Sequence, residues 1–189
     1  GFTQELIDAR YRSDLANDLG NLLRRLVSMV ERYFGGRVPP AATGRRPETV
    51  AAAEALRVRS EATVAPALAS AEALAVNDAL AHVMALVGET NRFLETTAPW
   101  TRAKERDLDS VATILYTGAE ALRIASVLLH PVMPERMAEL QRRLGWEGAD
   151  RDPTRDDLTW GLLRPGSIVA GGAPLFPRDI AEGLTAPGD

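Results

Sequence analysis

Cysteine is absent from this chain of 189 residues. Its absence excludes a disulfide scaffold, a thiolate metal site and a cysteine nucleophile. Aromatic residues are also scarce, at 5% of the sequence, whereas apolar residues make up 46%. The core must therefore consist mainly of Leu, Ala and Val, a composition that favours packed helices over a β-sandwich or barrel.

Long apolar stretches are lacking as well. By inspection, none approaches the roughly 18 residues that would predict a membrane span, and no signal peptide is visible at the N-terminus. The chain begins with Gly1, and its first residues already have the pattern of a helix. We therefore interpret it as a piece of a longer protein and expect a cytoplasmic monomer.

Lysine is nearly missing, since the chain has 21 Arg but a single Lys, Lys104. The net charge of -4 does not favour nucleic-acid binding over the whole surface, but the charges are unevenly distributed. Residues 20–46 hold six arginines and one acid, Glu31, which leaves a local net charge of +5. A basic segment of this kind is typical of a phosphate-binding surface, although a solvated helix face would have the same composition.

Hydrophobic periodicity predicts an all-α fold, a bundle of about five helices. We expect them over residues 3–34, 47–66, 75–96, 107–130 and 134–144. Thr3 is the expected N-cap of the first helix, which could break near Tyr11–Ser13, and the pair Gly35-Gly36 is a stop signal. Pro66 is expected to kink or end the second helix, and the short later connections predict antiparallel neighbours.

The amino-acid composition changes after residue 145. Residues 146–189 contain seven Gly and five Pro, which predicts an extended tail with one short helix or strand pair. We therefore divide the chain into a bundle, residues 1–145, and a tail, residues 146–189. The tail is expected to pack on the bundle or on a domain outside this chain.

The sequence offers little for catalysis. The two histidines, His82 and His130, have no second histidine or carboxylate at metal-ligand spacing, and no glycine-rich phosphate loop follows a strand. We expect no metal or cofactor in this chain, and we find no constellation for an autonomous hydrolase or transferase.

Several strings, in order and in register, resemble the C-terminal half of methionyl-tRNA synthetases, a class I synthetase family. They are Asp14-Leu15-Ala16-Asn17-Asp18-Leu19-Gly20-Asn21-Leu22 with Arg25, Asn91-Arg92-Phe93, Ala98-Pro99-Trp100, Leu129-His130-Pro131-Val132-Met133-Pro134 and Pro174-Leu175-Phe176-Pro177-Arg178. The resemblance covers nearly the whole chain. The sequence departs from the usual family pattern at two positions, with Arg12 in place of Asn and Gly35 in place of Asp. These differences affect the expected helix capping, and neither falls on a proposed base-reading residue.

The resemblance implies a helical bundle that receives the anticodon stem of a methionine-accepting tRNA. In that family an Asn, an Arg and a Trp read the anticodon CAU, chiefly its first base, and these positions match Asn21, Arg25 and Trp100. The family's catalytic signatures are absent here, so ATP, and any zinc, would belong to a catalytic half outside this chain. The resemblance also implies that the tail folds back toward that half through Pro174, Leu175, Phe176, Pro177 and Arg178.

The chemistry of these residues suits a flipped-out cytosine. Asn21 and Arg25 are four residues apart and share one helix face. The amide offers donors and an acceptor, and the guanidinium offers several donors, against a base edge with two acceptors and one donor. Trp100 could stack on the base. Further cations could hold phosphates, which position RNA without reading it: Arg32, Arg37, Arg45, Arg46, Arg102 and Lys104.

Other interpretations stay open at this point. Asn21 and Arg25 could belong to an ordinary solvated face, and Trp100 could plug the gap between two helices. The chain could be a stand-alone interaction or regulatory bundle without tRNA preference. It could also be the anticodon domain of a related class I synthetase, such as those for Cys, Leu, Ile or Val, although the joint presence of these three residues argues against that.

Overall fold

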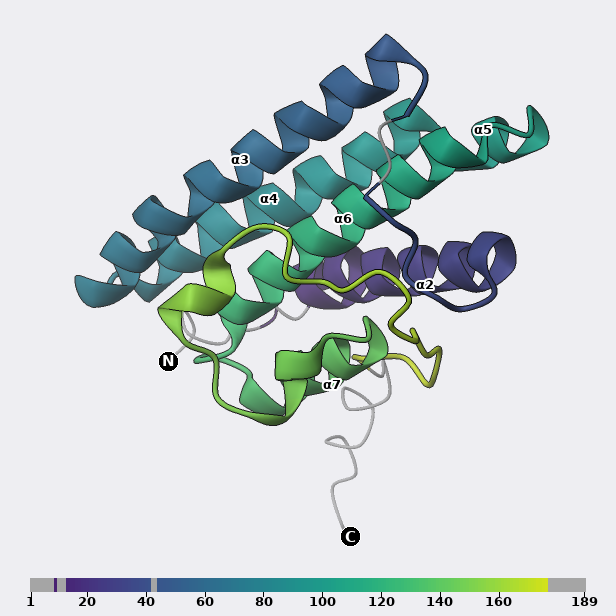
Figure 1. The fold of residues 1–189 in the computed structure, drawn as a ribbon. Helices are drawn as coiled ribbons and strands as arrows, with labels where there is room; N and C mark the ends of the chain where they lie inside the picture. The colour runs from purple at the N-terminus through teal and green to yellow at the C-terminus, as the bar shows by residue number, and fades with distance from the viewer. Residues whose placement is uncertain (1–8, 10–12, 42–43, 177–189) are drawn as a thin grey trace, which may run out of the picture.

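The computed structural model describes Ala9, residues 13–41 and residues 44–176. The expected N-cap Thr3 and most of the expected break at Tyr11–Ser13 lie outside the described residues. Figure 1 shows a layered arrangement of long helices with an irregular C-terminal segment running across them.

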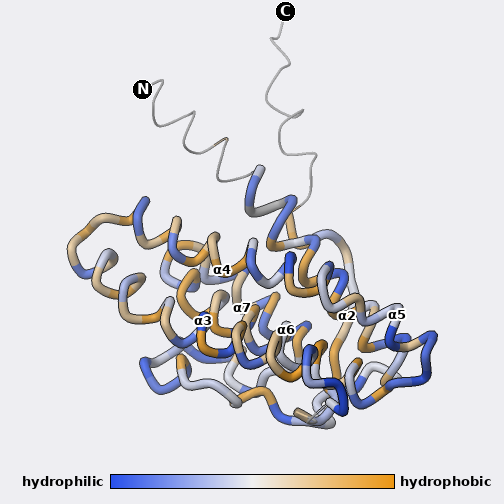
Figure 2. Tube along the Cα trace, turned by 90° about the horizontal axis from the view of Figure 1, so that it is seen from above, coloured by the Kyte–Doolittle hydropathy of each residue, from blue (hydrophilic) through white to orange (hydrophobic). Residues whose placement is uncertain are grey.

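The described residues confirm the all-α prediction, with five α-helices of ten residues or more. These are α2 (Gly20–Phe34), α3 (Pro47–Glu72), α4 (Val76–Thr97), α6 (Leu108–Leu129) and α7 (Pro134–Arg143), and a short α5 (Pro99–Lys104) lies between α4 and α6. The helices α3 and α4 form a long hairpin against α6, and α2 packs on α6 and α4. Figure 2 shows the apolar residues gathered between these helices.

The centre of the core is α6. Of its 22 residues, 19 are buried, and the other three are Leu108, Asp109 and Leu128. This helix contacts α2, α3, α4, α5 and α7 directly. Contrary to the sequence prediction, this helix is long and apolar enough to span a membrane by length and hydropathy alone. Because 94% of its apolar window is buried inside the protein, it is the core helix of a bundle.

Helix ends follow the expected capping chemistry in several places. Gly35 ends α2 in the left-handed conformation, with φ of 59°, as the stop signal predicted. Pro47 opens α3 at a position where a missing N–H costs nothing. Asp107 caps α6 by accepting a hydrogen bond from the backbone N–H of Ser110 at 3.1 Å.

The prediction that Pro66 ends or kinks the second helix was wrong in its first part, because α3 continues to Glu72. Proline removes the hydrogen bond to the carbonyl four residues earlier, that of Ala62. Both residues are exposed, so water can solvate that carbonyl. The buried residues on either side, Thr63 and Ala67, continue the packed face of the helix.

The first part of the tail is fixed to α6 by a buried ion pair. Arg123 and Glu120 both have side chains with no exposed area, and their closest atoms are 2.8 Å apart. The guanidinium also donates to the carbonyls of Asp157 and Thr159, and the carboxylate accepts from the backbone N–H of Leu163. Two buried charges thus satisfy the backbone of an irregular segment that has no regular ladder of its own.

Trp146 covers this ion pair. Its ring is buried and lies 5.4 Å from the Arg123 guanidinium carbon, and Arg151 lies over it at 5.8 Å. A Cβ atom at Gly148 would come within 2.4 Å of the indole, so the ring requires glycine there. Two short 3-10 helices follow, Glu147–Asp150 and Arg155–Leu158, instead of the single helix or strand pair that was predicted.

The second part of the tail runs beside the α2–α3 connection. The backbone N–H of Val38 donates to Ser167 at 2.8 Å, and that of Gly166 donates to Val38 at 2.8 Å. An isolated antiparallel bridge joins Arg37 to Ile168, and we find no longer strand pairing in the described part of the chain. Residues 146–176 therefore lie on the bundle itself.

Candidate functional site

Trp100 is positioned by a sharp turn between α4 and α5. Ala98 ends α4 in the left-handed conformation, with φ of 46°, which is uncommon for a residue with a side chain. Pro99 then starts α5 and is buried. The turn leaves Trp100 half-buried at the surface of the protein.

Arg25 joins three helices at this point. Its guanidinium carbon lies 5.9 Å from the centre of the Trp100 ring, a cation–π distance. From α4, Glu95 accepts a hydrogen bond from the guanidinium at 2.6 Å, and Asn91 accepts one at 3.4 Å. The arginine side chain is 21% exposed and that of Glu95 is 61% exposed, so the cluster stands at the edge of solvent.

Asn91 also ties α4 to the segment before α2. Its amide nitrogen donates to the backbone carbonyl of Asp18 at 3.2 Å. Asp18 belongs to a π-helical turn, Leu15–Leu19, that leads directly into α2, and such turns are frequent at functional sites. Burial raises the pKa of the Asp18 carboxyl, and nearby Asp14 raises it further.

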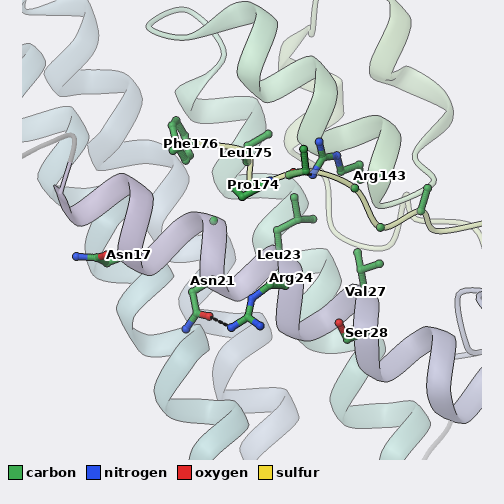
Figure 3. Close-up of a pocket in the computed structure, with 15 residues that line it drawn as sticks. Asn17, Asn21, Leu23, Arg24, Val27, Ser28, Arg143, Pro174, Leu175 and Phe176 are labelled. Atoms are coloured by element: carbon green, nitrogen blue, oxygen red, sulfur yellow. Dashed lines mark hydrogen bonds between the residues drawn. The ribbon is translucent and has the colours of Figure 1, made fainter. Parts of the chain in front are cut away.

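Asn21 lies on α2 one turn before Arg25 and is exposed. Its amide oxygen accepts a hydrogen bond from Arg24 at 2.8 Å. Figure 3 shows the two side chains turned toward each other. The structure therefore brings Arg25 and Trp100 into contact. Asn21 lies on the same helix as Arg25, and its described side-chain hydrogen bond is to Arg24.

The combined surface has the groups that an unpaired base requires. Trp100 is half-buried at the surface, and the Arg25 side chain is 21% exposed. The hydrogen bond of Asn21 to Arg24 uses its amide oxygen, and within the described part of the chain its amide nitrogen has no bond. An unpaired base is bound by stacking on an aromatic face and by hydrogen bonds to its Watson–Crick edge. The arrangement therefore offers the kinds of groups that bind a base.

The six cations suggested for phosphate contact fall into two groups. Arg45, Arg46 and Arg102 form ion pairs with carboxylates at the start of α6, at distances of 2.7 to 3.2 Å. Burial alone would raise the pKa of Asp107 in this cluster, but hydrogen bonds from Ser110 and Arg46 outweigh it and lower the pKa.

Among the residues that the structure describes, Arg32, Arg37 and Lys104 form no such ion pairs. Arg32 lies over the ring of Tyr33 at 5.6 Å, and Arg37 donates to the backbone carbonyl of Gly166 at 3.2 Å. Lys104 is exposed on α5, the helix that carries Trp100. These three keep more of their charge available for a phosphate than the other three do.

A groove of about 1110 Å³ separates α2 from the tail. One wall consists of Asn17 and of α2 residues from Gly20 to Ser28, and the other is the tail segment from Ala170 to Phe176. Arg143 holds that segment in place by donating to the carbonyl of Ala173 at 2.6 Å. Leu23 and Val27 face the groove together with the tail residues, as Figure 3 shows.

The tail residues singled out from the sequence are partly described. Leu175 is buried and Phe176 is half-buried against the bundle, while Pro174 is exposed. Pro177 and Arg178 lie outside the described residues. Among the residues that the structure covers, no group of three His, Asp or Glu side chains could hold a metal ion.

A family model for the anticodon binding domain of methionyl tRNA ligase matches residues 41–182, more than half of the chain. The chain belongs to this family. The match confirms the resemblance that the strings of the sequence indicated. Trp100 lies within the matched residues, whereas Asn21 and Arg25 precede them.

The relatives are methionine–tRNA ligases. That of Deinococcus radiodurans is 41% identical over 180 residues, which are 94% of this chain and 25% of the relative. That of Streptomyces coelicolor is 39% identical, covering 94% of this chain and 34% of the relative. The chain thus spans a quarter to a third of the length of the relatives it matches.

The fold matches a solved relative as well. Mycobacterium tuberculosis methionyl-tRNA synthetase, in complex with methionyl-adenylate, superimposes with a TM-score of 0.79 at 31% identity. The match covers 92% of this chain and 33% of that protein. The sequence and the fold therefore agree on the family.

Three residues around the site were not singled out from the sequence. Asn91 and Glu95 surround the Arg25 guanidinium, and Arg24 bonds to Asn21. Asn91 was noted only as part of a family string, and its contact with α2 depends on how α4 packs. Nothing in the sequence around Glu95 and Arg24 distinguishes them from ordinary exposed residues of a solvated helix face.

Proposed function

We propose that this anticodon-binding domain recognises the anticodon CAU of a methionine-accepting tRNA, as the specificity module of a methionine–tRNA ligase. Trp100 stacks on the first anticodon base, and Asn21 and Arg25 bond to its edge. Activation of methionine with ATP takes place in another part of the parent ligase, in the cytoplasm. The observation that carries the proposal is the contact between Arg25 and a half-buried Trp100 at 5.9 Å.

Two features support base recognition at this position. The Ala98-Pro99 turn fixes the tryptophan backbone, so less conformational entropy is lost when a base stacks on the ring. Arg25 is held by Glu95 and Asn91 in a defined orientation with one side toward solvent. A wrong base would leave these polar groups without partners, which is a large source of discrimination.

We assign phosphate binding to Arg32, Arg37 and Lys104, which have no carboxylate partner among the described residues. The other three candidates, Arg45, Arg46 and Arg102, would first have to leave their ion pairs. We therefore expect them to contribute less to the salt dependence of tRNA binding.

We also propose that the tail and its groove contact the catalytic part of the parent ligase. The relatives are three to four times as long as the segment they share with this chain. The groove between α2 and the tail is open and has apolar walls at Leu23, Val27 and Leu175. In this proposal the bundle, residues 1–145, binds the tRNA. The tail, residues 146–189, connects the bundle to the catalytic part.

The test of tRNA recognition is salt-titrated binding of the domain to RNA stem-loops that differ only in the anticodon. We expect the CAU loop to bind more tightly than the loop with the first base changed to U. Asn21→Ala and Arg25→Ala should each reduce that preference, because each removes a donor to the base edge.

The control variant is Arg59→Ala, which removes an exposed arginine on α3 that pairs with Glu89, away from α2 and α5. It should leave the preference unchanged. Equal affinity of the unaltered domain for all loops would contradict anticodon recognition and would favour a regulatory or interaction module.

A further inference from the structure

The Arg24–Asn21 contact restricts how the proposed site presents its amide. Arg24 donates from Nη2 to the Oδ1 atom of Asn21 at 2.8 Å, three residues apart on α2. Arg24 faces the groove beside the tail, whereas its neighbour Arg25 faces α4 and Trp100. The side chains of the two adjacent arginines therefore point in different directions from the helix and have different partners.

A guanidinium has hydrogen-bond donors and no acceptor. It can therefore bond to the oxygen of an amide but not to the nitrogen. If the Asn21 amide were turned by half a rotation, two donor groups would face each other and the bond would be lost. Arg24 thus favours the one orientation in which Oδ1 is occupied and Nδ2 is available to a ligand.

The orientation of the amide decides which pyrimidine it fits. The ring nitrogen N3 of cytosine is an acceptor, whereas that of uracil carries a hydrogen and is a donor. A fixed Nδ2–H group that faces this position can donate to N3 of cytosine. It is repelled by the N3–H group of uracil. An amide that turns freely could satisfy either base, donating to cytosine or accepting from uracil.

We propose that Arg24 is a positioning residue that makes Asn21 a donor toward the first anticodon base and so favours C over U. This inference rests on the proposed function, because it assumes that Asn21 contacts that base. Arg24 itself acts through Asn21 and does not need to touch the RNA.

The experiment uses Arg24→Met, which removes the donors but keeps the length and helix propensity of the side chain. Binding is measured for CAU and UAU stem-loops at several salt concentrations. We expect the ratio of the two affinities to fall about three- to tenfold, a range typical of one hydrogen bond. The loss should come mainly from tighter binding of the UAU loop. Arg24→Lys, which keeps a donor-only cation, should restore much of the ratio.

Arg32→Met is the matched control, because it removes an arginine of the same helix whose described contact is with the ring of Tyr33. It should weaken both loops equally. If Arg24→Met also weakens both loops equally and reduces the salt slope by about one, Arg24 binds a phosphate and the inference is overturned. An unchanged ratio overturns it as well. A failure of the proposed function is distinguishable, since it would appear as an absence of preference in the unaltered domain.

Discussion

Two clusters in this protein each contain an arginine, a glutamate and a tryptophan. At the solvent edge, Arg25 pairs with Glu95 and lies 5.9 Å from Trp100. Beneath the tail, Arg123 pairs with Glu120 and lies 5.4 Å from Trp146. The first cluster is partly open to water, whereas the ion pair of the second has no exposed area.

The difference between them lies in how completely their hydrogen bonds are used. Around Arg123 the charges bond to each other and to the backbone of the tail, which offsets the cost of burying them. Around Arg25 the bonds are few, and part of the guanidinium and the ring stay at the surface. The same residue types can therefore fix a fold in one place and stay available for a ligand in another.

The largest expected difference concerns stability. Arg123→Met should lower the free energy of unfolding by about 3–5 kcal/mol, because Glu120 would stay buried without its partner. Arg25→Met should lower it by about 0–1 kcal/mol, since its ion pair is partly exposed. Denaturant titrations followed by circular dichroism measure both. A comparable cost at the two arginines would show that the exposed cluster also holds the fold.

Removing both buried charges should not restore stability. In Glu120→Leu/Arg123→Met the carbonyls of Asp157 and Thr159 would lose their donors, and the N–H group of Leu163 would lose its acceptor. Buried backbone groups without partners are costly. A double variant as stable as the unaltered chain would mean that these backbone bonds contribute little.

A second difference concerns binding. Trp100→Ala should weaken binding to the CAU stem-loop by one to two orders of magnitude, estimated from a stacking energy of about 1–3 kcal/mol. The fold should change little, because the ring is only half-buried. Trp160→Ala is the control, since that half-buried ring lines a small cavity beside Tyr116 and α3. An affinity that is unchanged by Trp100→Ala would remove this tryptophan from the site.

The smallest effect is the response of the buried region to acid. The hydrogen bond and ion pair with Arg151 lower the pKa of Asp157 to about 2, from an ordinary value of 3.8. The folded state is therefore stabilised above about pH 4, and this contribution is lost as the pH falls toward 2. Its size is about 1–2 kcal/mol, allowing for the exposure of Arg151.

Thermal unfolding between pH 6 and pH 2 measures this contribution. Asp157→Asn should be less stable than the unaltered chain at pH 6, and the two should converge at low pH. Parallel curves over the whole range would mean that the ion pair with Arg151 does not couple folding to protonation.

Much of the fold could be predicted from the sequence because its signals are local. Hydrophobic periodicity predicted the first helix. Its apolar residues Leu19, Leu22, Leu26 and Val30 recur three or four positions apart, and all four are buried. Gly35 and Pro47 marked helix ends that the structure confirms. Such signals depend only on residues within a few positions of each other.

Features that depend on distant contacts could not be predicted. Arg123 and Glu120 look like an ordinary exposed pair three residues apart, and only the packing of the tail shows that they are buried. Pro66 looked like a helix end, because sequence alone does not show that its neighbourhood is solvated. At the candidate site, the three residues that the family resemblance implied stay predictions, and the partners Arg24 and Glu95 emerged only from the coordinates.

The π-helical turn at Leu15–Leu19 has a consequence for how this domain is joined to what precedes it. Such a turn contains one residue more than an α-helical turn, so it rotates the preceding segment by about 100° around the axis relative to α2. Deleting one residue there should leave α2 and its proposed base-binding face in place. The segment at Ser13 and Asp14 would then lie on another side of the helix axis. The turn therefore sets the direction from which the chain enters α2.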